Sequence, residues 1–231
     1  MKEITGGTFD FSSISFVDKN WATLVVMVAL LILTINAVVY RRKLVLSLQS
    51  LYSNRSFSQL SKEGKLFSEG NFIFSLPFIL LSWAACIQQL CTHYFPILRQ
   101  QISYIQLFGF ICLALIVMFF LKMLLDYILF ELFECSNERY VFHVSNYSFL
   151  LNSSLALLLG FVVVQYTNFY PFYIVISLIL IALYIIDIYK KYNLKSKRIN
   201  LFQFFLYFCT LEILPCLVIG KLLFNYGNKG F

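Results

Sequence analysis

The sequence predicts an all-α fold: a polytopic bundle of about six transmembrane helices with amphipathic helical segments on the cytoplasmic side. Apolar side chains make up 60% of the 231 residues, charged side chains only 13%, and the mean hydropathy is +0.80. A soluble domain would carry about a quarter charged residues. The apolar residues also gather into stretches of about 20, the length an α-helix needs to cross about 30 Å of hydrocarbon. The whole chain, 1–231, is therefore expected to form a single membrane domain.

Six stretches meet this length requirement. The first has an aromatic residue at each end, Trp21 and Tyr40, and a basic run directly after it, as is typical where a helix leaves the membrane. The second contains Pro77, which we place in the first helical turn because a missing N–H costs little there. The predicted spans cover residues of about 21–40, 72–91, 104–125, 148–166, 171–189 and 201–224.

The basic residues predict the orientation. Most of the 18 Lys and Arg side chains fall in or beside three connections, 41–71, 126–147 and 190–200. Cytoplasmic loops of membrane proteins carry the excess of Lys and Arg. These connections are therefore expected to be cytoplasmic and both termini periplasmic.

The first cytoplasmic connection has a helical apolar pattern. Its apolar residues recur at the spacing of one helix face, and basic residues precede them. This pattern predicts an amphipathic helix lying along the inner leaflet of the membrane. The residues of the pattern are Leu44, Val45, Leu48, Leu51 and Tyr52.

The second cytoplasmic connection combines an acidic face with an apolar stripe. Glu131, Glu134 and Glu138 recur at helical spacing, so the third span is expected to continue into the cytoplasm as a helix. A solvated acidic face is the simpler interpretation, because runs of charge are usually solvated. A docking face for a basic partner is the alternative.

Glu212, inside the sixth predicted span, is the first candidate for a functional residue. A charge at membrane depth costs about 2.5–3.5 kcal/mol, so this carboxyl group should be protonated, paired or in contact with a wet cavity. Pro215 offers a structural explanation, because it cannot donate to the carbonyl of Leu211 and a neutral carboxyl group could satisfy that backbone. Both interpretations stay open.

Other polar residues are weaker candidates. Asn36 and Asn152 lie within predicted spans, where interhelical hydrogen bonding is the first interpretation and the lining of a pathway with Glu212 the second. Arg139 and His143 lie one helical turn apart before the fourth span. They could bind a phosphate or a lipid headgroup, or simply anchor the helix at the interface.

Several classes of function are disfavoured by what the sequence lacks. It has only two histidines and no pair of cysteines at metal-ligand spacing, so no metal or cofactor is expected. It has no phosphate-binding loop and no hydrolase or metalloprotease motif. The basic residues lie beside apolar segments, which argues against nucleic acid as a partner. Enzymatic activity is left open, with a non-enzymatic role favoured.

Two segments resemble a known family. Residues 53–60 and 198–215, the second ending in Leu211-Glu212-Ile213-Leu214-Pro215, look like the uncharacterised Bacteroidota inner-membrane family called domain of unknown function 4271. The similarity covers most of the chain, and the region around Cys135-Ser136-Asn137 departs from the pattern. The resemblance implies a Gram-negative inner membrane and no established biochemical activity.

Three functional hypotheses follow. The first is a non-enzymatic subunit or scaffold of an envelope assembly, with the lipid bilayer around it and a membrane protein or a second copy of the chain as partner. The second is a small proton-coupled transporter or carrier that uses Glu212. The third is a lipid-modifying membrane enzyme, for which Glu138, Arg139 and His143 are the only visible polar cluster.

Overall fold

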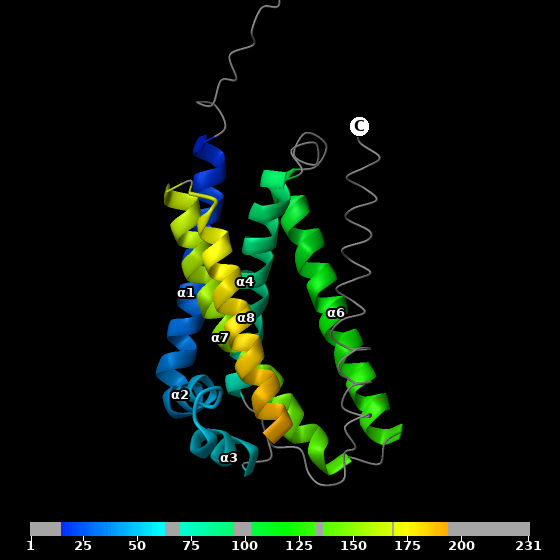
Figure 1. Cartoon of the computed structure of the whole chain (residues 1–231). Helices are drawn as coiled ribbons and strands as arrows, with labels where there is room; N and C mark the ends of the chain where they lie inside the picture. The colour runs from blue at the N-terminus through cyan, green and yellow to red at the C-terminus, as the bar shows by residue number, and fades with distance from the viewer. Residues whose placement is uncertain (1–14, 63–69, 95–102, 133–135, 168, 194–231) are drawn as a thin grey trace, which may run out of the picture.

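The computed structural model describes residues 15–62, 70–94, 103–132, 136–167 and 169–193 (Figure 1). Within these ranges every regular element is an α-helix, and five of the helices are long and apolar enough to cross a membrane. The predicted fold class is therefore confirmed. The predicted span 201–224 lies outside the described residues. The helices are α1 (Ser15–Val39), α2 (Arg41–Gln49), α3 (Asn54–Lys62), α4 (Gly70–Tyr94), α6 (Tyr104–Leu132), α7 (Ser136–Thr167) and α8 (Phe172–Asn193).

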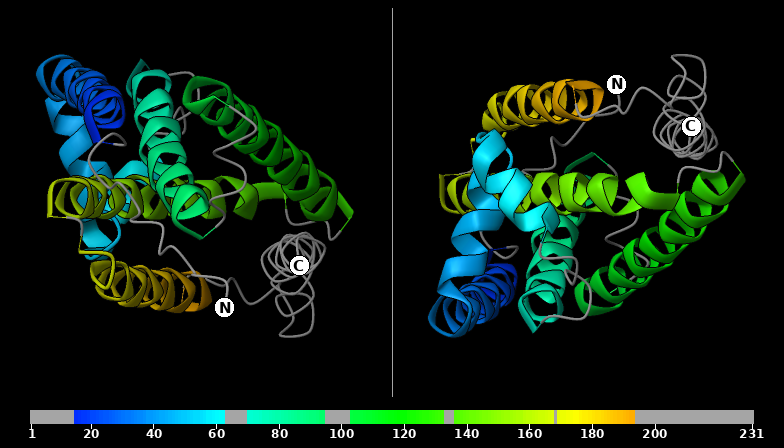
Figure 2. Two further views of the ribbon diagram at one scale, coloured as in Figure 1. Left: turned by 90° about the horizontal axis from the view of Figure 1, so that it is seen from above. Right: turned by 90° about the horizontal axis from the view of Figure 1, so that it is seen from below.

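Helix α7 lies at the centre of the described bundle. It packs against α4 on one side and α8 on the other, and α1 and α6 lie on either side of α4 (Figure 2). The short helices α2 and α3 lie across one end of the bundle, together with the C-terminal ends of α6 and α8 and the N-terminal end of α7 (Figure 1). We call this the α2–α3 end.

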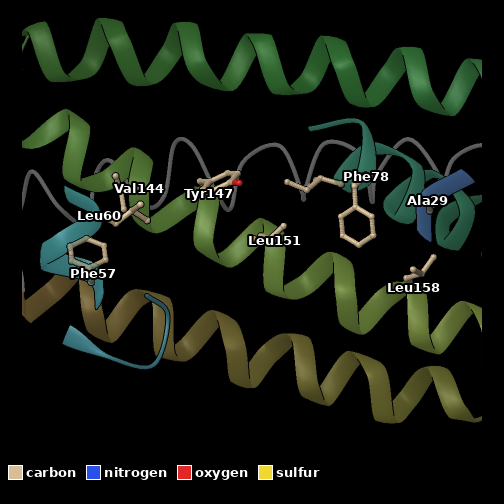
Figure 3. Close-up of a cluster of buried hydrophobic side chains, with 9 residues drawn as sticks. Ala29, Phe57, Leu60, Phe78, Val144, Tyr147, Leu151 and Leu158 are labelled. Carbon is tan, nitrogen blue, oxygen red and sulfur yellow. The ribbon is translucent and has the colours of Figure 1, made fainter. Parts of the chain in front are cut away.

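The main apolar core runs along α7. Small buried side chains such as Ala22 and Ala85, which belong to one apolar cluster, let α1 and α4 approach closely, as small residues do between membrane helices. Figure 3 shows the core extending from the α3 side chains at one end to α1 and α4 at the other. Its buried residues are Ala29, Phe57, Leu60, Phe78, Ile79, Val144, Tyr147, Leu151 and Leu158.

The first predicted amphipathic segment differs from expectation. It forms two helices, because α2 ends at Gln49 and α3 starts at Asn54. Leu44, Leu51, Phe57 and Leu60 are buried, so the apolar side of α2 and α3 faces the bundle and not the inner leaflet. Of the five residues in the predicted pattern, Leu44 and Leu51 are buried while Val45 and Tyr52 are exposed, because the chain turns after Gln49, and the partner of the buried face is protein.

Two further expectations are corrected. The fourth predicted span started at residue 148, whereas α7 starts at Ser136 and its membrane-length apolar part runs from Tyr140 to Thr167. Hydropathy missed residues 140–147, about two turns of helix, because they include polar side chains, of which Ser145 and Tyr147 are buried. Pro77 is not in the first turn, because α4 already starts at Gly70. The carbonyl of Ile73 therefore lacks its usual intrahelical donor.

Gly160 of α7 packs tightly against the side chain of Ile176 in α8. A Cβ atom at this position would lie 2.7 Å from Cγ1 of Ile176, so the isoleucine would have to move. We expect Gly160→Ala to lower the free energy of unfolding by about 1–3 kcal/mol, the usual cost of overpacking.

The matched control is Gly109→Ala in α6, where a Cβ atom would meet nothing within 4 Å. Alanine favours the helix over glycine by about 1 kcal/mol, so this change should leave stability equal or higher. Unfolding in mixed detergent micelles measures both. Equal effects of the two substitutions would contradict the close packing of α7 on α8.

Candidate functional site

The polar residues of the described membrane helices gather around the first half of α7. Ser145, Tyr147 and Ser148 are each at most 3% exposed, and they face different neighbours because successive helical residues are about 100° apart. Polar groups buried away from water need hydrogen-bond partners. Three clusters around α7 supply them.

The first cluster joins α1, α4 and α7 through Ser75. Nδ2 of Asn36 donates to Ser75 Oγ at 2.7 Å, and the hydroxyl of Tyr147 donates to the same oxygen at 2.8 Å. The Ser75 hydroxyl donates to the carbonyl of Asn71 at 2.7 Å. One hydroxyl group thus uses its donor and both acceptor positions to hold three helices together.

The second cluster caps the C-terminal end of α2. The last carbonyls of a helix lack intrahelical donors, and these are buried under α7. The Ser148 hydroxyl donates to the carbonyl of Ser47 at 3.1 Å, and Nδ2 of Asn152 donates to the carbonyl of Leu48 at 3.2 Å. The Ser50 and Ser148 hydroxyls are also hydrogen-bonded to each other. Side chains of α7 therefore replace the missing helical donors of α2.

The third cluster adds a buried cation and a buried carboxylate from α8. Lys190 is 5% exposed, and its Nζ donates to the carbonyls of Ser50 and, at 3.4 Å, Ser53. The same Nζ lies 4.7 Å from the centroid of the Phe57 ring. Asp187, one turn earlier and 1% exposed, accepts a hydrogen bond from the Ser145 hydroxyl at 2.5 Å. The connection between α2 and α3 is thus held by a positive charge from α8.

A groove between α4, α6 and α7 adjoins these clusters. The empty volume of the groove, including the space open to solvent, is about 600 Å³. Its walls are mostly apolar, and its polar end is at the α2–α3 end, where Lys122, Asp126 and His143 line it. Asp126 is 2% exposed, and its carboxylate lies 3.8 Å from Nδ1 of His143.

A smaller polar cluster lies at the opposite end of the bundle. Nε2 of Gln89 donates to Oε1 of Gln165 at 3.0 Å, and the hydroxyl of Tyr173 donates to Gln89 Oε1. Nε2 of Gln88 donates to the carbonyl of Tyr104 at 3.0 Å. These bonds tie α4 to α6, α7 and α8, as interhelical polar contacts do in membranes.

The structure places some of the predicted site residues and not others. Asn36 and Asn152 both make interhelical hydrogen bonds, while a role for them in a pathway stays a prediction. His143 faces Asp126, and the side chain of Arg139 lies outside the described residues, as do Glu212 and Pro215. Among the described side chains, no three His, Cys, Asp or Glu residues gather as metal ligands would.

Asp126, Asp187 and Lys190 were not among the candidate site residues predicted from the sequence. All three are at most 5% exposed. The available signal was the spacing of Asp187 and Lys190, opposite charges one turn apart in an otherwise apolar helix.

The fold and these clusters define a polytopic helical membrane protein whose buried polar groups join its helices. The chain belongs to the family described as Domain of unknown function (DUF4271), whose model matches residues 22–223. The resemblance seen in the sequence is therefore confirmed. No curated protein and no solved structure matches the chain.

Proposed function

We propose that this protein is a non-enzymatic subunit of a membrane-bound assembly, and that α2 and α3 form the docking platform for an acidic partner protein. The proposal includes the inner membrane of a Bacteroidota cell as location, with the α2–α3 end in the cytoplasm and both termini in the periplasm. The observation that carries it is the way these two helices are fixed to the membrane bundle while their polar side faces outward.

The platform is rigid because its attachment uses several elements. Phe57 and Leu60 of α3 are buried in the main core, and Ser148 and Lys190 bond to the backbone of the α2–α3 segment. A surface held in this way loses little conformational entropy when a partner binds. Rigidity of this kind suits a docking surface.

The outer side of the platform is basic and mostly polar. The segment 41–62 contains no Asp or Glu, and its basic residues Arg41, Arg42, Arg55 and Lys62 are exposed. Within it, Val45 and Tyr52 are the only exposed large apolar residues. A helix that inserts into lipid turns its apolar side to the acyl chains, whereas here that side is covered by protein. The outer face therefore suits an acidic protein surface in water.

The grouping of basic residues also supports the proposed orientation. The basic platform lies at the same end of the bundle as the C-terminal ends of α6 and α8 (Figure 1), and Lys122 and Lys190 belong to the C-terminal halves of these two helices. Positive residues concentrate on the cytoplasmic side of membrane proteins. The carrier hypothesis stays a prediction, because Glu212 lies outside the described residues.

The test is co-purification of the tagged protein at native level, followed by mass spectrometry. We expect a partner at constant ratio to the wild-type chain, and a loss of about tenfold or more with Arg55→Glu/Lys62→Glu, because like charges across an interface are repelled. Arg41, Arg42 and Lys43 are left unchanged so that the topology signal stays intact.

The control variant is Arg55→Lys/Lys62→Arg, which keeps both charges and should keep the partner. A protease-accessible tag on each terminus confirms that topology is unchanged. A wild-type chain that purifies alone as a discrete species would contradict the subunit proposal. A wild-type chain recovered with anionic lipid but no protein would assign the platform to the membrane surface.

A further inference from the structure

The groove between α4, α6 and α7 is built from two chemically different halves. The N-terminal end of α6 contacts α4, and Phe108 of α6 also packs edge to face on Trp21 of α1, with ring centroids 5.8 Å apart. The C-terminal part of α6 reaches α7 through Asp126. Figure 1 shows that α6 and α4 are close at one end of the bundle and move apart toward the α2–α3 end. The half-buried side chains of Leu76, Leu80 and Phe119 line the resulting groove.

The polar half carries one charge of each sign. Lys122 and Asp126 are one turn apart on α6, at the end of its apolar stretch Tyr104–Ile128. This is the depth at which the apolar core of a bilayer gives way to headgroups. Lysine at such a position keeps its ammonium group at the interface while its methylene chain follows apolar surface.

The two halves together match one class of molecule. We propose that the groove binds a phospholipid with a phosphate and a primary ammonium in its headgroup, such as phosphatidylethanolamine. Lys122 pairs with the phosphate, the carboxylate of Asp126 accepts from the ammonium, and an acyl chain follows the apolar wall. His143, 3.8 Å from Asp126, holds that carboxylate at the polar end.

Charge complementarity selects this headgroup over its alternatives. A phosphatidylglycerol headgroup has the phosphate but no cation for Asp126, which is 2% exposed and carries the only carboxylate among the residues lining the groove. A phosphocholine headgroup has a cation without N–H donors, so it cannot hydrogen-bond to a carboxylate. Charge-assisted hydrogen bonds are the stronger kind, worth about 1.5–3 kcal/mol.

The experiment measures lipid binding by native mass spectrometry and, separately, the melting temperature by thermal unfolding. The purified full-length protein is delipidated in mild detergent and titrated with phosphatidylethanolamine, phosphatidylglycerol or phosphatidylcholine of the same acyl chains. We expect phosphatidylethanolamine to bind at one saturable site and to raise the melting temperature, since a ligand of the folded state stabilises it. The other two lipids should bind about tenfold more weakly.

Two kinds of variant locate the site. Lys122→Gln should weaken phosphatidylethanolamine binding about tenfold, while Glu131→Gln, which neutralises an exposed charge on α6 at the same end, should not. Leu80→Trp should fill the groove and remove the lipid-dependent rise in melting temperature without lowering the melting temperature of the lipid-free protein.

The wild-type lipid comparison decides the proposal even where a variant fails to fold. Equal stabilisation by all three lipids, or an unchanged affinity in both Lys122→Gln and Leu80→Trp, would overturn it. Stronger binding of phosphatidylglycerol would overturn it as well, because that result requires a site with only positive charge.

Discussion

Replacing Lys190 with methionine should lower the free energy of unfolding by about 3–5 kcal/mol, the cost of breaking a buried charge arrangement by removing one partner. The change removes the donor to the Ser50 and Ser53 carbonyls and the cation that interacts electrostatically with Asp187. It keeps most of the side-chain volume, so the loss reports charge and hydrogen bonding and not packing. Reversible unfolding in mixed detergent micelles gives the value.

Two further variants define the cause of that loss. Lys62→Met removes an exposed lysine from α3 and should change stability by less than about 0.5 kcal/mol. Lys190→Met/Asp187→Asn removes both charges and should recover part of the stability, because no buried carboxylate is left without its cation. A double variant less stable than Lys190→Met would contradict the electrostatic explanation.

Phe78→Ala is expected to have the second largest effect, about 3 kcal/mol. Phe78 of α4 is fully buried in the core that α4 forms with α1 and α7 (Figure 3). Lipid tails are as apolar as a protein core, so the transfer of the ring out of the core contributes little inside a membrane. The cavity left behind and its lost dispersion contacts account for the expected loss.

The matched substitution is Phe120→Ala in α6, where the side chain is 66% exposed on a span-length helix. No cavity forms there because lipid fills the space, so the change should be within about 0.5 kcal/mol. Thermal unfolding of both variants in the same detergent makes the comparison. Equal losses would show that α4 does not pack against α1 and α7 as described.

Hydropathy predicted the helices well and their partners poorly. The five described spans each overlap a predicted span, because the length of an apolar stretch is a local property of the sequence. What the apolar side of α2 and α3 packs against is not a local property, because it depends on distant parts of the chain. Leu44 and Leu51 carry the same pattern whether they face lipid or the helix bundle, and only the three-dimensional structure distinguishes the two.

The candidate site shows the same division. Interhelical hydrogen bonding was the first interpretation of Asn36 and Asn152, from their type and position alone, because a buried amide must find a partner. Their acceptors, Ser75 Oγ and the carbonyl of Leu48, lie on other helices and follow no spacing rule. The sequence did not indicate that Asp126 and Lys190 are buried, because the end of a membrane helix can be exposed to water or covered by other helices. Composition does not distinguish these two cases.

The caps of α2 constrain the order of events during biosynthesis. The donors to its final carbonyls, and to the connection that follows, come from residues far along the chain: Ser148 is 101 positions after Ser47, and Lys190 is 140 positions after Ser50 in that connection. When α2 and α3 leave the ribosome, neither donor has been synthesised, so water must solvate those carbonyls. The segment can settle onto the bundle only after α7 and α8 have entered the membrane. A nascent chain stalled before α7 therefore presents its α2–α3 segment to chaperones and proteases, whereas the finished chain does not.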